Sequence, residues 1–440
     1  MPVDSDVLVR ALTTDPPQIS AEDVPHIVAA GLAGEVRGRL PPDHPFTKLL
    51  WPGHLALGVR HSLIRSELRP LIAAWEREGI PALLFKGFAL TEFEYATPGE
   101  RFYGDVDVLL PEEPATVIRA VHLALAHGWR SDGAHAFPER WTHEGAHLYS
   151  PNGQIRLDVH RFVVAWSVGS QRRQRTLTRA MWAHAQAVDW EGIRVWCPSP
   201  TDALVIALAL NRQWSGDQGG LKPADYADTR VLLRRSGLTM HQLAQRAQHV
   251  GAGHTWAAFW QVCNPERRHF ALNAQATSGL LKRAARHDGV NLNREVWRIR
   301  LSAVPRRLRS MISVLPDVLA ARWALRGGGD PRAHLARWTR SGSTRPLPPS
   351  RLQDVILGVS HLTRLLYPRQ SRVGTCLPRA YATYRVLHRL GCPVVFVSGV
   401  GRTSAGIQGH AWIENARGSL DAYGEPLNRM HFKEVFHYPE

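Results

Sequence analysis

The sequence predicts a multidomain α+β protein, on the basis of its length and of two changes of pattern along the chain. At 440 residues it exceeds the roughly 100–200 residues typical of one domain. Short apolar strands alternate with helices over residues 80–160, and a Gly- and Pro-rich stretch precedes a separate pattern in the last ninety residues. The parts expected are an α/β domain with N-terminal helices at 1–197, a helical, Arg-rich extension at 198–325, a linker at 326–349 and a small α+β domain at 350–440.

The first half of the chain predicts helices followed by a mixed unit. Apolar residues recur every three or four positions over 25–40 and 54–78, which is the helical period, and Pro70 would kink the second helix. An apolar strand at 81–85 then ends at Lys86-Gly87. The elements expected after it are a helix at 88–95, a strand at 106–110, a helix at 114–127 and a strand at 154–159.

The second half predicts a long helical region and then another mixed unit. Thr201 is expected to cap an apolar helix at 203–210, and helices continue to about residue 325. After the linker, the patterns predict helices at 352–367 and 376–390 and strands at 393–400, 410–414 and 419–423.

The composition excludes several classes of protein. Hydrophobic residues at 44% and charged residues at 21% are ordinary globular values, not those of a disordered or fibrous chain. The apolar run at 203–210 is far shorter than the roughly 18 residues of a membrane span, and no secretory signal is visible at the N-terminus. The four cysteines form no CxxC pair, which argues against a disulfide scaffold and a zinc ribbon. We expect a cytoplasmic protein with no membrane partner.

Positive charge is concentrated in one part of the chain. The net charge is +16, and residues 261–340 carry 16 Lys and Arg against 5 Asp and Glu. We interpret this region first as a solvated helical surface and second as a site for an anionic partner such as phosphate or an acidic peptide. No zinc finger, RNA-recognition signature or heptad zipper accompanies it, so we expect no nucleic-acid partner.

Two aspartates on one strand indicate a candidate metal site. Asp105 and Asp107 are two residues apart, so the alternation of a strand turns both side chains to one face. Asp158, on a later strand, supplies a third oxygen if the two strands are neighbours. Such oxygens suit Mg²⁺, and the Lys86-Gly87 turn offers an ammonium and an open backbone to a triphosphate. An exposed strand edge is the alternative, and His160, on the face of Asp158, is interpreted as a packed or surface residue.

The segments around these residues resemble the uncharacterised nucleotidyltransferase family of bacteria. The motifs are Leu-Leu-Phe-Lys-Gly-Phe-Ala-Leu at 83–90 and Arg-Phe-Tyr-Gly-Asp-Val-Asp-Val-Leu-Leu at 101–110, within a resemblance over about 45–260. It implies a nucleotidyltransferase-like α/β fold that uses Mg²⁺ and a nucleoside triphosphate, with a trailing helical part that includes Asp228. The residues it implies are Lys86, Gly87 and Arg101 for nucleotide binding and Asp105, Asp107 and Asp158 for metal binding.

Cys376, His410 and Asp421 are candidates for a catalytic triad. Cys376 precedes a helix with Pro378 in its first turn, and the positive end of a helix favours the nucleophilic thiolate. His410 opens a strand, and a turn near 415–418 would bring Asp421 back beside it. The imidazole would then activate the thiol while the carboxylate orients the imidazole. A small buried hydrophobe is the alternative for Cys376, and the cysteines interpreted as structural are Cys197, Cys263 and Cys392.

The motifs around this triad resemble the transglutaminase-like B2 protein of lasso-peptide biosynthesis, over about residues 348–440. They are Gly-Thr-Cys-Leu-Pro-Arg-Ala at 374–380, Gly-Cys-Pro-Val-Val-Phe-Val-Ser-Gly-Val at 391–400 and Gly-His-Ala-Trp-Ile-Glu at 409–414, followed by Asp421. The resemblance implies a small transglutaminase- or papain-like domain that acts as a cysteine protease and needs no cofactor. Its implied task is to remove the leader from a ribosomally made precursor peptide. A separate leader-binding protein would present the precursor, and a cyclase would form the macrolactam.

The sequence therefore favours a leader peptidase fused to a Mg²⁺-dependent nucleotidyltransferase-like domain whose acceptor is not specified. Two alternatives remain open. In one, nucleotidyl transfer is the main activity and the C-terminal domain is an accessory. In the other, the N-terminal half is a non-catalytic scaffold that binds nucleotide or peptide.

Overall fold

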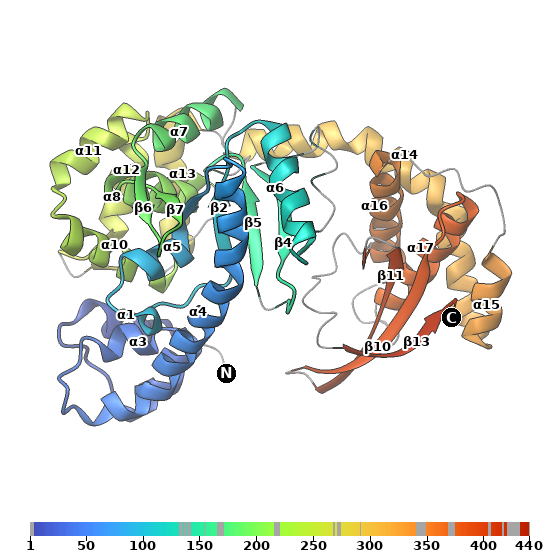
Figure 1. The fold of residues 1–440 in the computed structure, drawn as a ribbon, viewed down its shortest axis with the longest axis horizontal. Coiled ribbons are helices and arrows are strands. Elements are labelled where there is room, and N and C mark those ends of the chain that lie inside the picture. The colour runs from blue at the N-terminus through green and yellow to red at the C-terminus, as the bar shows by residue number, and fades with distance from the viewer. Residues whose placement is uncertain are drawn as a thin grey trace. The chain divides into compact units, whose positions relative to one another are not determined.

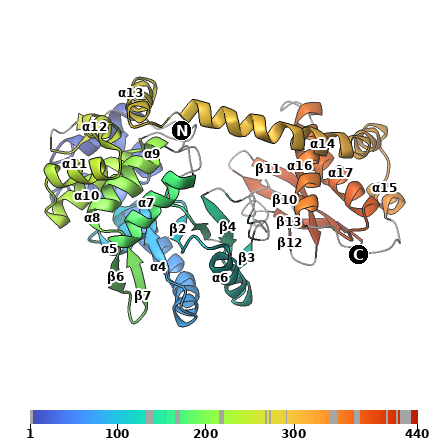
Figure 2. The same cartoon turned by 90° about the horizontal axis from the view of Figure 1, so that it is seen from above.

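Two compact units make up the computed structural model of the chain, drawn in Figures 1 and 2. The N-terminal unit contains residues 1–131 and 140–297, and the C-terminal unit contains residues 132–139 and 298–440. None of the described helices combines the length and the apolar character needed to cross a membrane. The residues that the structure describes are 4–131, 135, 138, 141, 143–153, 155–164, 171–214, 221–266, 269–270, 274–290, 292–339, 349–367, 375–403, 406–415, 418–419 and 432–439.

Helices begin the N-terminal unit. They are α1 (Ser5–Thr13), the 3₁₀ turn η1 (Ala21–Asp23), α2 (Val24–Ala29), α3 (Ala33–Arg37) and α4 (Pro45–Arg77). The single helix expected at 25–40 is wrong, because Gly31 separates α2 from α3 with a left-handed backbone at φ 70°. Helix α4 begins before the helix expected at 54–78 and continues through both Pro52 and Pro70.

A seven-stranded mixed sheet forms the centre of this unit. Its strands are β1 (Leu83–Phe85), β2 (Val106–Leu109), β3 (Arg130–Ser131), β4 (Glu144–Tyr149), β5 (Arg156–His160), β6 (Gln186–Asp189) and β7 (Arg194–Cys197). Their order across the sheet is β3-β4-β5-β2-β1-β7-β6. β2 pairs parallel with β5, and β5 pairs antiparallel with β4. The three strands expected from the sequence are confirmed as β1, β2 and β5, whereas the other four did not feature among the expected elements.

Helices cover both faces of this sheet. Leu84 and Val108 pack on one face with α4 and α6 (Pro114–Ala126), while Leu83 and Leu109 pack on the other with helices that follow residue 199. Those helices are α8 (Pro200–Asp202), the π-helix η6 (Ala203–Leu210), α9 (Asn211–Trp214), α10 (Pro223–Ser236), α11 (Met240–His249) and α12 (Gly253–Val262). The remaining elements are α5 (Lys86–Phe93), η2 (Pro98–Glu100), α7 (Gln171–Ala183), β8 (Cys263–Asn264), β9 (His269–Phe270) and α13 (Ala274–His287). The helical extension therefore shares one core with the sheet.

The residue that caps the first helix of the helical extension is not the expected one. Ser199, not Thr201, caps α8, because its side chain accepts a hydrogen bond from the backbone N–H of Asp202. Thr201 lies inside the first turn, where Pro200 provides the fixed φ of an N1 residue.

The C-terminal unit packs helices against an antiparallel sheet. Its helices are α14 (Leu292–Gly327), which contributes residues to both units, α15 (Pro331–Trp338), α16 (Pro349–Leu366) and α17 (Cys376–Arg389). Its strands are β10 (Val395–Thr403), β11 (Gly406–Asn415), β12 (Gly418–Ser419) and β13 (Phe432–Tyr438), in the order β12-β11-β10-β13. Asp317 of α14 is 1% exposed and is paired at 2.6 Å with Arg389 of α17, which ties the two helices together. The expected turn between β11 and β12 is confirmed by the pairing of Asn415 with Gly418.

Part of the range expected as a linker, 326–349, is helical. Leu335 of α15 is fully buried in the core of the C-terminal unit. Asp330 caps this helix by accepting a hydrogen bond from the N–H of Arg332, and Pro331 is its first residue. The stretch that ends α14 therefore also supplies the cap and the first residue of α15.

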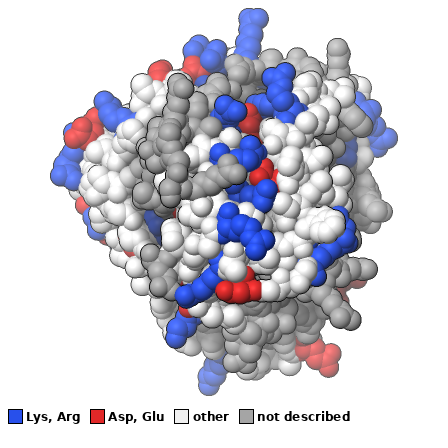
Figure 3. All heavy atoms as spheres, turned by 90° about the vertical axis from the view of Figure 1, so that its right-hand side faces the viewer, with Lys and Arg blue, Asp and Glu red and all other residues white. Residues whose placement is uncertain are grey.

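Basic side chains are prominent on the surface. Figure 3 shows blue Lys and Arg side chains over one face of the molecule, with fewer red ones among them. Within the Arg-rich region 261–340, Arg306, Arg307 and Arg309 of α14 are exposed. Their exposure fits a solvated helical surface.

A largely buried carboxylate anchors α5 in the N-terminal unit. Glu92 is 11% exposed and accepts hydrogen bonds from His61 at 2.6 Å, Arg65 at 2.9 Å and the indole of Trp190 at 2.8 Å. Burial alone would raise the pKa of Glu92, but these donors outweigh it and hold the pKa below its usual value. Glu92 therefore links α4, α5 and the β6–β7 turn.

The Glu92→Gln variant should lower the free energy of unfolding at pH 7 by about 1–3 kcal/mol, because charged hydrogen bonds are lost while side-chain size is kept. A carboxylate whose pKa is depressed by folding stabilises above its unfolded pKa of about 4.3, and this contribution disappears as the pH falls through the folded pKa. The difference between wild type and variant should therefore shrink in acid, as measured by chemical denaturation at several pH values. Glu191→Gln, at an exposed partner of Arg65, serves as the control and should have little effect. A difference that does not depend on pH would contradict this role of Glu92.

Candidate active site

Strand register brings carboxylates and imidazoles together on one face of the sheet. Asp107 of β2 lies directly opposite Asp158 of β5, and His147 of β4 lies opposite Asp158 on its other side. His160 is two residues after Asp158 and so shares its face. Asp107 and Asp158 are buried, at 5% and 4% exposure. The structure therefore brings together the two strands that the sequence required to be neighbours.

Lys86 provides the first counter-charge to this group. Its Nζ lies 2.6 Å from Oδ1 of Asp107, and Nε2 of His160 lies 2.9 Å from the same oxygen. Burial alone would raise the pKa of Asp107, but Lys86 and His160 outweigh it and hold the pKa well below its usual range. Burial, and then the charge of Lys86, lower the pKa of His160, which keeps its ring neutral. Lys86 reaches Asp107 from a left-handed backbone at φ 59°, which a lysine adopts only at a cost in strain.

Arg156 is the counter-charge of the second aspartate. Its guanidinium makes two hydrogen bonds to Asp158, at 2.7 and 2.9 Å. Burial, supported by the neighbouring charges of Asp107 and Glu144, nevertheless raises the pKa of Asp158 to about 7. Lys86 is 27% exposed and Arg156 39% exposed, so both can turn away when another cation takes their place.

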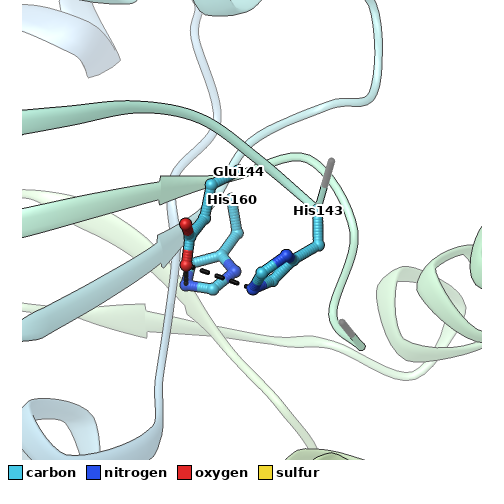
Figure 4. Close-up of side chains that lie close together, drawn as sticks. All are labelled: His143, Glu144 and His160. Carbon is cyan, nitrogen blue, oxygen red and sulfur yellow. Dashed lines mark ion pairs between the residues drawn. The ribbon is translucent and has the colours of Figure 1, made fainter. Parts of the chain in front are cut away.

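Three residues with side chains that commonly bind metals, His143, Glu144 and His147, lie near Asp107 and Asp158 and were missed by the sequence analysis. Glu144 of β4 lies 3.1 Å from His143 and 3.0 Å from His147, and Figure 4 shows His143 and His160 both turned toward its carboxylate. Burial opposes ionisation of Glu144, but the hydrogen bonds from His143 and His147 outweigh it and keep its pKa well below its usual range. Three ligand-type residues within five positions were a usable signal.

A cleft of about 800 Å³ lies over these groups. The predicted residues Lys86, Gly87, Arg101, Asp105, Asp107 and Asp158 all line it, together with His143 and Glu144. Arg212 and Lys222 line it as well, and they come from the helical extension. The charge of Arg212, and then burial, lower the pKa of Lys222, which shows that positive charges crowd together there. The cleft thus combines carboxylates with several cations, as binding of a metal-bound polyphosphate requires.

Arg101 lies in the cleft but is engaged in a buried ion pair. Its Nε and Nη2 each donate to a carboxylate oxygen of Asp228 at 2.7 Å, and Tyr95 donates to the same carboxylate at 2.8 Å. Arg101 is 8% exposed and Asp228 is 1% exposed. The geometry thus gives Arg101 a structural task, joining the segment before β2 to α10. Nucleotide binding by Arg101 remains a prediction.

Gly87 and Phe88 have packing tasks at the strand-to-helix turn. A Cβ on Gly87 would lie 2.5 Å from Cβ of Tyr103, so only glycine allows this approach. Phe88 is fully buried and stacks on His61 with ring centroids 5.2 Å apart. The bulky Phe88 side chain therefore lies in the core.

Mg²⁺ fits the oxygen donors of this face. One ligand atom each from Asp107, Asp158 and His160 lies within 4.8 Å of the others, and Asp105 lines the same cleft. Two buried carboxylates from adjacent strands match the preference of Mg²⁺ for a few carboxylates and several waters. Asp107 and Asp158 would hold the ion, with Asp105 beside them.

The C-terminal unit places two of its three candidates on a helix and a strand that pack together. Cys376 is the first residue of α17, and α17 packs on β11, which carries His410. The residues that line a small pocket at this contact are Ile356, Arg379, Ala380, Thr383, Ala411, Trp412 and Ile413. Ala411 and Ile413 of β11 belong to the buried core that α17 shares, and His410, one residue before Ala411, alternates to the other face of the strand. His410 stacks on Phe432, with ring centroids 5.2 Å apart. Asp421 lies outside the described residues.

Two parts of the chain match known protein families. Residues 20–264 match a family described as uncharacterised nucleotidyltransferase, and residues 317–437 match the transglutaminase-like superfamily. No match was found among curated proteins or among solved structures. The chain therefore fuses an N-terminal nucleotidyltransferase domain of this family to a C-terminal transglutaminase-like domain. The first family implies a nucleotide substrate, and the buried carboxylates agree with a metal cofactor.

Replacing Asp228 with Ala should lower the free energy of unfolding by about 3–5 kcal/mol, because Arg101 would stay buried without its counter-charge. The double variant Arg101→Met with Asp228→Leu should recover much of this loss, since apolar residues of similar volume can replace a buried pair. Urea denaturation followed by tryptophan fluorescence measures both effects. Asp43→Ala, at an exposed site, is the control and should change stability by less than about 0.5 kcal/mol. A small effect of Asp228→Ala would contradict a structural pair.

Proposed function

This chain belongs to the uncharacterised nucleotidyltransferase family, and we propose that it is a two-part enzyme of peptide maturation. Its C-terminal domain would be a cysteine peptidase that removes the leader from a ribosomally made precursor, as in lasso-peptide biosynthesis. Its N-terminal domain would bind a nucleoside triphosphate with Mg²⁺. The observation that supports the peptidase proposal is that Cys376 is the first residue of α17, a helix that packs on β11, the strand that carries His410.

The proposed cleavage follows from this placement. The positive end of α17 favours the thiolate of Cys376, which attacks the scissile carbonyl and forms an acyl-enzyme. The imidazolium of His410 gives its proton to the leaving amine and then takes one from the attacking water, and breakdown of the acyl-enzyme releases the peptide acid and restores the thiolate and imidazolium. Asp421 is proposed to orient His410. This chemistry needs no cofactor.

The proposed partners follow from the same activity. The substrate is the precursor peptide, a separate leader-binding protein presents it, and a separate cyclase forms the macrolactam. The resemblance of residues 374–380 and 409–414 to the B2 protein of lasso-peptide biosynthesis supports this substrate class.

Nucleotidyl transfer is the second candidate function, favoured by the acidic and basic groups of the N-terminal cleft. Asp107 and Asp158 would hold Mg²⁺, which neutralises the charge that develops at phosphorus when it is bound. Lys86, Arg212 and Lys222 are placed to bind phosphate oxygens. Asp105 would orient the attacking hydroxyl of the acceptor. A scaffold that only binds nucleotide or peptide would use the same cations without transfer.

The Cys376→Ala variant should abolish leader cleavage, because it removes the nucleophile. The measurement is intact-mass analysis of the precursor incubated with its leader-binding partner and either form of the protein. Cys392→Ala, a second free cysteine of the same unit, is the matched control and should cleave normally. Cleavage by Cys376→Ala, or none by wild type while the partner binds the precursor, would refute the peptidase assignment.

Asp105→Asn combined with Asp107→Asn should reduce Mg²⁺-dependent labelling from a radiolabelled nucleotide at least about 100-fold, since several kcal/mol of charge stabilisation are lost. Leader cleavage should be unaffected. Asp43→Asn, exposed and outside the cleft, is the control. Loss of cleavage in the double variant, without labelling by wild type, would support the scaffold instead.

A further inference from the structure

Two imidazoles and a carboxylate converge beside the proposed Mg²⁺ ligands. His143, Glu144 and His160 each offer a ligand atom within 4.8 Å of the other two. Oε1 of Glu144 lies 3.1 Å from Nε2 of His143 and 3.9 Å from Nε2 of His160, the ring nitrogen that faces Asp107. The two rings lie 5.4 Å apart, and Figure 4 shows the carboxylate of Glu144 next to both. Two nitrogens and one oxygen form a donor set unlike the carboxylates of the Mg²⁺ site.

The backbone fixes this arrangement. Glu144 is directly opposite His160 in the pairing of β4 with β5. The carbonyl of His143 accepts hydrogen bonds from the N–H groups of Arg161 at 2.8 Å and Phe162 at 3.1 Å. The three side chains therefore start from positions that strand pairing has already set, and little ordering is needed to bring them together.

His160 has one ring nitrogen without a partner. Its Nε2 lies 2.9 Å from Oδ1 of Asp107, and a carboxylate can only accept, so Nε2 carries the proton. Nδ1 is then left with its lone pair. His160 is 1% exposed, and Nδ1 is buried with no hydrogen-bond partner among the residues that the structure describes. Figure 4 draws this second nitrogen on the side of the ring nearer to His143. A buried lone pair that lacks a donor is poised to bind a cation.

Two further contacts resemble the outer shell of a metal site. Asp107 holds Nε2 of His160, which is the carboxylate–histidine arrangement that orients metal-binding imidazoles. His147 lies 3.0 Å from Oε2 of Glu144 and so holds the oxygen that is not shared with His143. We propose that His143, Glu144 and His160 bind a divalent transition-metal ion of the Zn²⁺ type, beside the carboxylates of Asp107 and Asp158 that would hold Mg²⁺.

The donor set decides the class of metal. Imidazole nitrogens with one carboxylate suit Zn²⁺ and its neighbours, and three protein ligands leave a fourth position open. Bonds of about 2.0–2.1 Å place tetrahedral ligand atoms about 3.3 Å apart, close to the 3.1 Å between His143 and Glu144. Because both residues line the cleft, the open position would accept water or an oxyanion such as phosphate.

Equilibrium dialysis of the full chain with Zn²⁺, in millimolar Mg²⁺ to occupy the oxygen site, tests this proposal without any nucleotide. Wild type should bind one Zn²⁺ with two imidazoles and no sulfur in its X-ray absorption spectrum. His143→Ala should weaken binding at least tenfold, and Asp107→Asn should weaken it about 10–100-fold through the lost outer contact. His127→Ala, at an exposed histidine of the same unit, should bind like wild type.

Asp105→Asn separates the two metal sites, because Asp105 belongs only to the predicted Mg²⁺ set, and it should leave Zn²⁺ binding unchanged. His143→Gln replaces His143→Ala if circular dichroism shows that the alanine variant does not fold. Equal binding by wild type and the His143 variant, loss of binding in Asp105→Asn, or sulfur in the metal shell would each overturn the proposal. None of these outcomes depends on whether the cleft transfers nucleotides.

Discussion

Buried negative charge governs the N-terminal unit. Asp107 and Asp158 face each other on adjacent strands with almost no exposure, and two carboxylates in such a place cannot both ionise without cations close to them. The surrounding structure supplies those cations. Lys86 is held in a left-handed conformation that reaches Asp107, and Arg156 grips Asp158 from the same strand. The charges of the cleft are thus a consequence of placing acids in a sheet that is covered on both faces.

The two units use related means to place reactive groups. In each of them a helix starts next to a sheet, as α5 does after β1 and α17 does against β11, and the chemistry-bearing residues stand at that helix start or on the facing strand. Ion pairs with a buried carboxylate hold these parts together: Arg101 with Asp228 in the first unit, and Arg389, whose side chain is 43% exposed, with Asp317 in the second.

Sequence patterns within a segment predicted the elements that depend on residues close together in the sequence. The strand of Asp107, the strand of Asp158 and the helix of Cys376 all lie where apolar patterns placed them. What the sequence did not reveal depends on distant pairing. Strand β4 was missed, and with it Glu144 and His147, because its burial comes from β5 and α6. The ion pair of Arg101 was also not predictable, because nothing in the neighbouring sequence indicates that Asp228, 127 residues away, is its partner. Helix α15 was read as linker because the Asp-Pro pair that starts it follows three glycines.

The carboxylates and imidazoles of the N-terminal site lie on three neighbouring strands, and the register between these strands places them on one face. This arrangement limits how the site can change during evolution. Shifting β5 by a single residue against β2 or β4 would turn Asp158 and His160 to the opposite face at once. Insertions and deletions inside these strands therefore remove the whole constellation, whereas changes of length in the connecting loops leave it intact. Related proteins should therefore keep or lose these site residues together. A relative that retains only some of them should have lost the others by point substitution.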